Sequence, residues 1–82
     1  MSRVVRVLVS GGTGLLGQAL LGTAPEGWDL EATWHVHPPP IERRTRFHSL
    51  DVRDTDAVLA LIGRLSPDVV VHTASIGSVD LA

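Results

Sequence analysis

Three regularly spaced glycines are the residues of this chain whose pattern most directly indicates chemistry. Gly11, Gly14 and Gly17 recur at every third position in the stretch SGGTGLLG. A glycine adopts the backbone angles of a tight turn, and without a Cβ it lets a bulky anion approach the main chain. The spacing predicts that Gly11 forms the turn, Gly14 leaves room for a pyrophosphate and Gly17 lets a helix pack closely on the preceding strand. The alternative is a glycine-rich turn that binds no ligand.

The residues on either side of the glycines predict the elements that hold this turn in place. Residues 4–9 form an apolar run rich in β-branched side chains, which is typical of a buried strand. A helix is expected over residues 14–23, and its free N–H groups would favour an anion at its start. A strand, a glycine turn and a helix in this order are the setting that dinucleotide binding requires.

The rest of the chain predicts three more strands and one more helix. Apolar and polar residues alternate over residues 30–36, and three prolines at positions 38–40 end this second strand. A short strand over residues 46–50 precedes a helix that we expect Asp54 to cap. The apolar stripe of that helix consists of Val58, Leu61, Ile62 and Leu65. The last strand lies within residues 68–73 and is apolar on both faces, as in a buried parallel strand.

The order β-α-β-β-α-β predicts an α/β fold. With right-handed crossovers it builds the first half of a Rossmann doubly wound parallel sheet, with strand order 3-2-1-4. The chain has 82 residues, so it forms one domain or part of one. Its net charge of −2 gives no electrostatic case for binding nucleic acid or a membrane surface. There is no cysteine, which excludes disulfides and thiolate metal sites but does not constrain the compartment. No apolar run approaches the ~18 residues of a membrane span, and we expect a cytoplasmic location by default.

Three motifs together resemble a known family. The stretches VLVSGGTGLLGQALL, LDVRD at residues 50–54 and PDVVVHTAS at residues 67–75 are similar to the extended short-chain dehydrogenase/reductases. The nearest branch by resemblance is the dTDP-4-dehydrorhamnose reductase-like proteins, which include the regulatory β subunit of methionine adenosyltransferase. The resemblance implies an oxidoreductase that reduces a 4-keto sugar nucleotide by hydride transfer. The alternatives are an epimerase or dehydratase of sugar nucleotides and a non-catalytic NADP-binding regulatory module.

The resemblance also implies cofactor-binding roles for matched residues. The three glycines would line the pyrophosphate, with backbone N–H groups of Leu15 and Leu16 beside them. Asp51 and Val52 match the pair that contacts adenine, where Asp51 accepts a hydrogen bond from the exocyclic amine. Taken alone, Asp51 is equally well explained as a turn residue. Ala74 and Ser75 match the segment beside the ribose on the nicotinamide side.

This sequence departs from the family in its catalytic residues. Members complete catalysis with a Tyr-x-x-x-Lys pair, and this chain contains neither tyrosine nor lysine. We therefore assign no catalytic residue. We expect the 82 residues to be a partial NAD(P)-binding Rossmann domain, the N-terminal fragment of a longer reductase. A sugar nucleotide would bind only with further sequence present.

The residues after the second predicted strand bear on cofactor choice. NAD-selective sites carry an acid about 20 residues beyond the glycine turn, whereas this region holds His35 and His37, followed by Arg43 and Arg44. We therefore expect NADP, with NAD as the alternative, and include His35 among the cofactor-binding residues. Solvent-facing arginines are the other interpretation. A metal site is not expected, because the two histidines lack an evident third ligand.

Two further expectations concern packing. Trp34 stands near the end of the second strand, where it would either flank the adenosine or belong to the core. The fourth strand, at residues 69–71, would be an exposed apolar edge if no further strand covers it. Such an edge predicts self-association.

Overall fold

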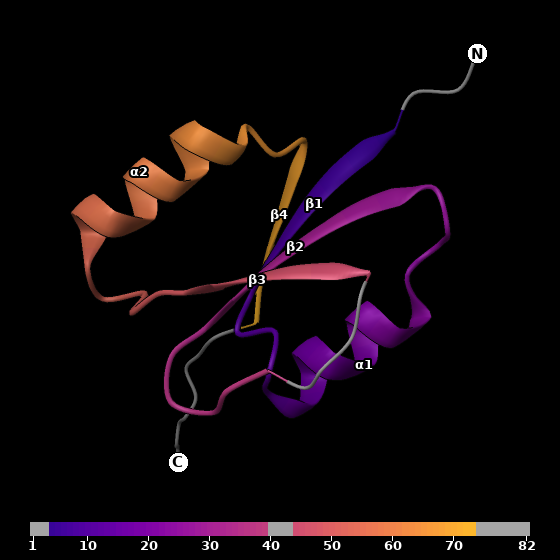
Figure 1. Cartoon of the computed structure of the whole chain (residues 1–82), viewed down its shortest axis with the longest axis horizontal. Helices are drawn as coiled ribbons and strands as arrows, with labels where there is room; N and C mark the ends of the chain where they lie inside the picture. The colour runs from indigo at the N-terminus through magenta and orange to yellow at the C-terminus, as the bar shows by residue number, and fades with distance from the viewer. Residues whose placement is uncertain (1–3, 40–43, 74–82) are drawn as a thin grey trace.

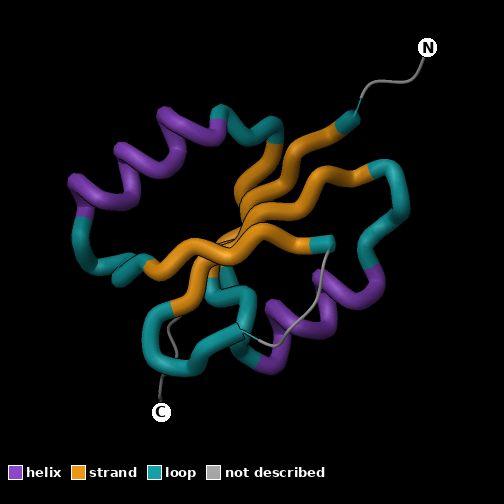
Figure 2. The backbone as a smooth tube through the Cα atoms, viewed as in Figure 1, coloured by secondary structure: helices purple, strands orange, loops and turns teal. Residues whose placement is uncertain are grey.

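The protein is described here from a computed structural model that covers residues 4–39 and 44–73. Strands and helices alternate along these two ranges (Figure 1). In chain order they are β1 (Val5–Ser10), α1 (Leu15–Thr23), β2 (Trp28–Trp34), β3 (Thr45–Ser49), α2 (Thr55–Leu65) and β4 (Val69–His72). The strands lie side by side in one sheet (Figure 2). Their order is β3-β2-β1-β4, and every pairing is parallel. This is the predicted first half of a Rossmann sheet.

The two helices cover opposite faces of the sheet (Figure 1). Successive side chains of a strand point to opposite faces, so β1 contributes to both layers. Val7 and Val9 are buried on the α1 side, where Leu21 of α1 packs against the sheet. Leu8 and Ser10 are buried on the other side, toward α2. Because all four strands are parallel, their carboxyl ends meet at one edge of the sheet. Open α/β sheets bind ligands at this edge.

The helices begin and end where the sequence predicts. Gly14 is the N-cap of α1, with an extended backbone. Asp54 caps α2, and its side chain accepts a hydrogen bond of 3.1 Å from the Ala57 N–H. At the other end Ser66 is left-handed (φ 47°) and its N–H donates to the Ile62 carbonyl.

Three strands are offset from their predicted positions, and β1, at Val5–Ser10, is one residue later than the predicted 4–9. β2 begins at Trp28 and ends at Trp34, because Trp28 pairs with Val5 and the ladder with β3 closes at the Trp34–Ser49 pair. His35 therefore lies just after the strand and not within it. β3 is likewise one residue earlier than predicted.

The sequence predicts a last strand that is apolar on both faces, like an interior strand, and that forms an exposed apolar edge where no further strand covers it. In the described part of the chain it is such an edge. β4 lies at an edge of the sheet and pairs there with β1. Val69 and Val70 are 46% and 48% exposed. The apolar run therefore predicted the strand correctly, but it does not show whether a second strand pairs with the outer edge of β4.

Within the described ranges, neither helix is long and apolar enough to cross a lipid bilayer.

Candidate functional site

The glycine turn joins β1 to α1 at the carboxyl edge of the sheet. Gly11 has φ 79°, a left-handed conformation that favours glycine, as the spacing predicts. Its N–H donates to Thr33 Oγ1 at 3.0 Å, and the Gly12 N–H donates to the Thr33 carbonyl at 2.8 Å. Thr33 is buried on β2, so one residue anchors the turn to the neighbouring strand.

Two glycines of this turn are required by close packing within the protein. A Cβ on Gly12 would lie 2.6 Å from the Ala32 Cβ, far inside contact distance. A Cβ on Gly17 would lie 2.2 Å from the Gly11 carbonyl oxygen, so at this residue α1 packs closely on the turn and not, as predicted, on the strand. The sequence interpretation missed Gly12, although its position beside Gly11 was a usable signal.

Packing within the protein does not explain why residue 14 is a glycine. Its backbone angles, φ −75° and ψ 170°, are open to any residue. A Cβ there would meet only the Gly11 carbonyl oxygen, at an ordinary contact distance of 3.4 Å. The fold would therefore accept a side chain at this position, and the space it would fill lies at the start of α1. This is the space that a bound pyrophosphate needs.

The start of α1 is suited to an anion. The N-cap makes no side-chain hydrogen bond, and no acidic residue lies in the first turn. Leu15 and Leu16 follow with side chains that are 91% and 67% exposed. The first N–H groups of a helix lack partners within the helix, and its dipole adds positive potential there. The residues present thus fit a pyrophosphate by geometry and by electrostatics.

A second group of predicted residues lies after β2 and β3. His35 Nε2 lies 3.6 Å from Asp51 Oδ2, so the structure brings these two candidates together. Arg53 also binds Asp51: its Nε donates to Oδ1 at 3.0 Å and its Nη2 to Oδ2 at 2.9 Å. The Arg53 backbone N–H adds a third hydrogen bond, to Oδ1. The Arg53 guanidinium and backbone N–H hold the pKa of the Asp51 carboxyl well below its usual range.

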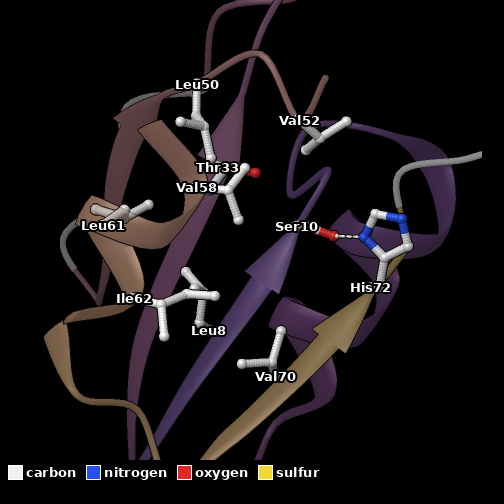
Figure 3. A pocket seen from close by; sticks show the side chains of 10 residues that line it. All are labelled: Leu8, Ser10, Thr33, Leu50, Val52, Val58, Leu61, Ile62, Val70 and His72. Atoms are coloured by element: carbon white, nitrogen blue, oxygen red, sulfur yellow. Dashed lines mark hydrogen bonds between the residues drawn. The ribbon is translucent and has the colours of Figure 1, made fainter. Parts of the chain in front are cut away.

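An apolar cavity lies between α2 and the carboxyl half of the sheet (Figure 3). Its volume is about 110 Å³. It is lined by Leu8, Ser10, Thr33, Leu50, Val52, Val58, Leu61, Ile62, Val70 and His72. Val52, one of the predicted adenine contacts, belongs to this lining, and Ser10 Oγ and His72 Nδ1 lie 2.6 Å apart at one side. The apolar wall and its few polar groups are a typical lining for a binding pocket.

The remaining predicted residues are placed as follows. The Arg44 guanidinium donates to the carbonyls of Ala24 and Pro25, at the amino ends of the strands. Arg44 is thus at the edge opposite His35. Trp34 is half-buried and takes part in the backbone ladder, where its carbonyl accepts from the Leu50 N–H at 2.8 Å. Arg43, Ala74 and Ser75 lie outside the described residues.

Comparison with known proteins agrees with a dinucleotide-binding fold. The chain is 39% identical over 71 residues to methionine adenosyltransferase 2 subunit beta of Xenopus laevis, across 85% of this chain and 20% of that protein. It is 34% identical over 77 residues to GDP-L-fucose synthase of Azorhizobium caulinodans, across 93% of this chain and 21% of the relative. A crystal structure from Burkholderia cenocepacia J2315, of a protein described as an epimerase, superposes with a TM-score of 0.70 at 27% identity, over 89% of this chain and 26% of that one.

The chain spans about a fifth of the length of these curated relatives. The sequence model of the NAD dependent epimerase/dehydratase family matches residues 7–82, which is nearly the whole chain. That family depends on a nicotinamide dinucleotide, which agrees with the glycine turn and the open helix start. The chain belongs to the NAD dependent epimerase/dehydratase family.

Proposed function

We propose that this chain binds a nicotinamide dinucleotide along the carboxyl ends of its strands, with its pyrophosphate at the start of α1. One observation carries the proposal: Gly14 is a glycine that the fold itself does not require. The uncapped first turn of α1 supports it, because its N–H groups offer hydrogen bonds to an anion. Gly11, Gly14, Gly17, Leu15 and Leu16 would line the pyrophosphate in this proposal.

The adenosine half of the cofactor would lie across the ends of β2 and β3. Asp51, near His35, would accept a hydrogen bond from the adenine amine, and Val52 would offer an apolar contact to the ring. Ala74 and Ser75 would lie on the nicotinamide side. The dinucleotide supplies hydride chemistry when bound, and the chain's own residues hold and orient it.

We propose NADP as the preferred cofactor. His35 is the first residue after β2 and is exposed, with its Nε2 3.6 Å from Asp51 Oδ2; from this position it would face a 2′-phosphate, and no acid follows β2 within residues 35–39. Arg44 is not part of this proposal, because it binds carbonyls at the opposite edge.

Calorimetric titration with NADP and NAD tests both proposals. We expect NADP to bind more tightly, and His35→Ala to reduce that preference. Arg44→Ala serves as the matched cation control and should leave the preference unchanged. Binding of neither dinucleotide would refute the site, whereas equal or tighter binding of NAD would refute only the cofactor preference.

For the whole protein we propose an NAD(P)-dependent sugar-nucleotide reductase of the dTDP-4-dehydrorhamnose reductase type. The similarity to a GDP-L-fucose synthase supports chemistry on sugar nucleotides. Because the chain has no tyrosine and no lysine, the isolated 82 residues should not oxidise NADPH in the presence of a dTDP-4-keto sugar. Sugar-dependent loss of nicotinamide absorbance above a no-protein blank would contradict this.

The second candidate is a non-catalytic regulatory module. It is favoured by the 39% identity to a methionine adenosyltransferase 2 subunit beta. A pull-down with a methionine adenosyltransferase catalytic subunit, with and without NADP, separates this candidate from the reductase. Binding of that subunit favours the module, and turnover of a sugar nucleotide by the whole protein favours the enzyme.

We also propose that the chain self-associates through β4. The Thr73 N–H donates to the Ser10 carbonyl of β1, and Val69 pairs with Val7, so by the alternation of strand hydrogen bonds Val69 and Val71 bond to β1 and the backbone groups of Val70 and His72 face the outer edge. No charged side chain protects β4 from pairing.

A further inference from the structure

Arg53 fixes the carboxylate of Asp51 in one orientation. Its guanidinium binds both carboxylate oxygens in a fork, at 3.0 Å and 2.9 Å, and its backbone N–H binds Oδ1 at 3.0 Å. A planar guanidinium in this arrangement fixes the direction of a carboxylate as well as its position. The Asp51 backbone is held too, because its carbonyl accepts from the N–H of Asp54, the cap of α2.

This arrangement leaves one oxygen of Asp51 able to accept a further hydrogen bond. Each carboxylate oxygen has two lone pairs. Both lone pairs of Oδ1 are used, by the Nε and the backbone N–H of Arg53. Oδ2 accepts one bond from the Arg53 Nη2, and among the described residues His35 Nε2 also approaches it, at 3.6 Å, beyond hydrogen-bond distance. The free acceptor position of Asp51 therefore belongs to Oδ2, on the side of His35.

We propose that Arg53 is a positioning residue that makes the site selective for a 6-aminopurine over a 6-oxopurine. The inference rests on the proposed function, in which Asp51 faces the adenine edge. A fixed carboxylate with one free acceptor position suits the exocyclic amine of adenine, which is a donor. Hypoxanthine presents a carbonyl oxygen at the same place, and two acceptors repel each other.

The fork is what prevents the carboxylate from adapting to the wrong base. Hypoxanthine carries a donor at N1, next to its carbonyl group. A carboxylate that rotates freely can turn from the carbonyl to this N–H and recover a hydrogen bond. Held by Arg53, Asp51 turns less readily toward this N–H, so hypoxanthine loses the bond and the acceptor that faces its carbonyl is left unpaired. Removal of Arg53 should therefore weaken discrimination between the bases more than it weakens binding in general.

The test compares NADP with nicotinamide hypoxanthine dinucleotide phosphate by calorimetry. For the unmodified protein we expect NADP to bind about tenfold more tightly. Arg53→Ala should bring the two dissociation constants to within about twofold, and Arg53→Lys, which cannot form the fork, should give an intermediate ratio. Asp51→Asn should favour the hypoxanthine dinucleotide, because its amide can donate to the carbonyl. Arg64→Ala, at the end of α2, removes the same charge and should keep the original ratio.

The outcomes separate this inference from the proposed function. If the unmodified protein binds neither dinucleotide, both the proposed site and the proposed role of Arg53 are refuted. If it binds NADP but does not discriminate, or if Arg53→Ala keeps the full ratio, only the role of Arg53 is refuted. Circular dichroism of each variant establishes that it is folded, and Arg53→Lys decides the question if Arg53→Ala does not fold.

Discussion

The carboxylate of Glu31, on β2, lies 2.7 Å from His48 Nε2, on the neighbouring strand β3. Glu31 is completely buried, and Arg46 completes its environment with a 2.7 Å hydrogen bond from Nε. Both partners come from the edge strand, because Glu31 pairs with Arg46 and Thr33 with His48 in the parallel register. The group stabilises the attachment of β3 to the sheet and so supports the position of Asp51, which follows β3.

Glu31→Gln should destabilise the protein, because it removes the charge that both partners bind. We expect the free energy of unfolding to fall by about 1–3 kcal/mol, the cost of losing hydrogen bonds to a charged buried group. Urea denaturation followed by circular dichroism measures it. Glu26→Gln removes the same charge in the exposed turn after α1 and should change stability by less than about 0.5 kcal/mol. Equal effects of the two substitutions would show that the Glu31 group contributes nothing specific.

Acid should destabilise the protein through the same carboxylate. Burial raises the pKa of Glu31, but hydrogen bonds from Arg46 and His48 outweigh it, so this pKa lies below its ordinary value in the folded protein. The unfolded chain then binds more protons at low pH, and the stabilisation is lost as pH falls from about 5 to 3. Unfolding measured across this range should show a steeper loss of stability for the unmodified protein than for Glu31→Gln. Parallel curves would contradict the assignment.

Gly17→Ala should disrupt the glycine turn. Its new Cβ would lie 2.2 Å from the Gly11 carbonyl oxygen, which is backbone and cannot move aside without shifting the turn. We expect a loss of about 3 kcal/mol in unfolding free energy, at the upper end for an overpacked site. The matched control is Gly22→Ala in the same helix, where nothing lies within 4 Å and alanine favours the helix by up to about 1 kcal/mol. Thermal unfolding should therefore move in opposite directions for the two variants, and a stable Gly17→Ala would refute the packing argument.

Self-association through β4 predicts a concentration-dependent sedimentation coefficient. Val69→Lys should shift the protein toward monomer, because a lysine on an edge strand opposes pairing with a second copy. A monodisperse monomer of the unmodified protein at high concentration would contradict the proposal. An unchanged association of Val69→Lys would place the contact elsewhere on the surface.

The strand order and both helices could be predicted from the sequence because their signals are local. The apolar run before the glycines and the Asp54 cap each indicate structure within a few residues. Strand limits were less accurate, since the β2 ladder depends on pairing with Val5 and with Ser49, which are remote in sequence. The sequence of β4 resembles that of an interior strand, yet β4 lies at an edge within the described residues, because an apolar sequence does not reveal whether a neighbouring strand is present.

The parts of the site that depend on neighbouring residues could likewise be predicted, and the parts that depend on remote residues could not. The positive φ of Gly11 follows from the spacing, whereas the anchoring of the turn by Thr33 joins residues 22 positions apart. Arg53 passed unnoticed, although it lies two residues from Asp51, because a charged residue in a turn is usually solvated. Arg44 was considered for a phosphate, but its contact with Ala24, 20 residues away, is set by tertiary structure.

The most direct test of the central claim is NADP binding by Gly14→Ala, measured by calorimetry beside its unfolding free energy. The fold accepts a Cβ at Gly14, with only a 3.4 Å contact to Gly11, so stability should fall by no more than about 1 kcal/mol. The same Cβ would occupy the space of the pyrophosphate, so affinity for NADP should fall at least about tenfold. Gly63→Ala, in α2 with nothing within 4 Å, is the control and should bind as the unmodified protein does. A folded Gly14→Ala that binds NADP with undiminished affinity would contradict the account.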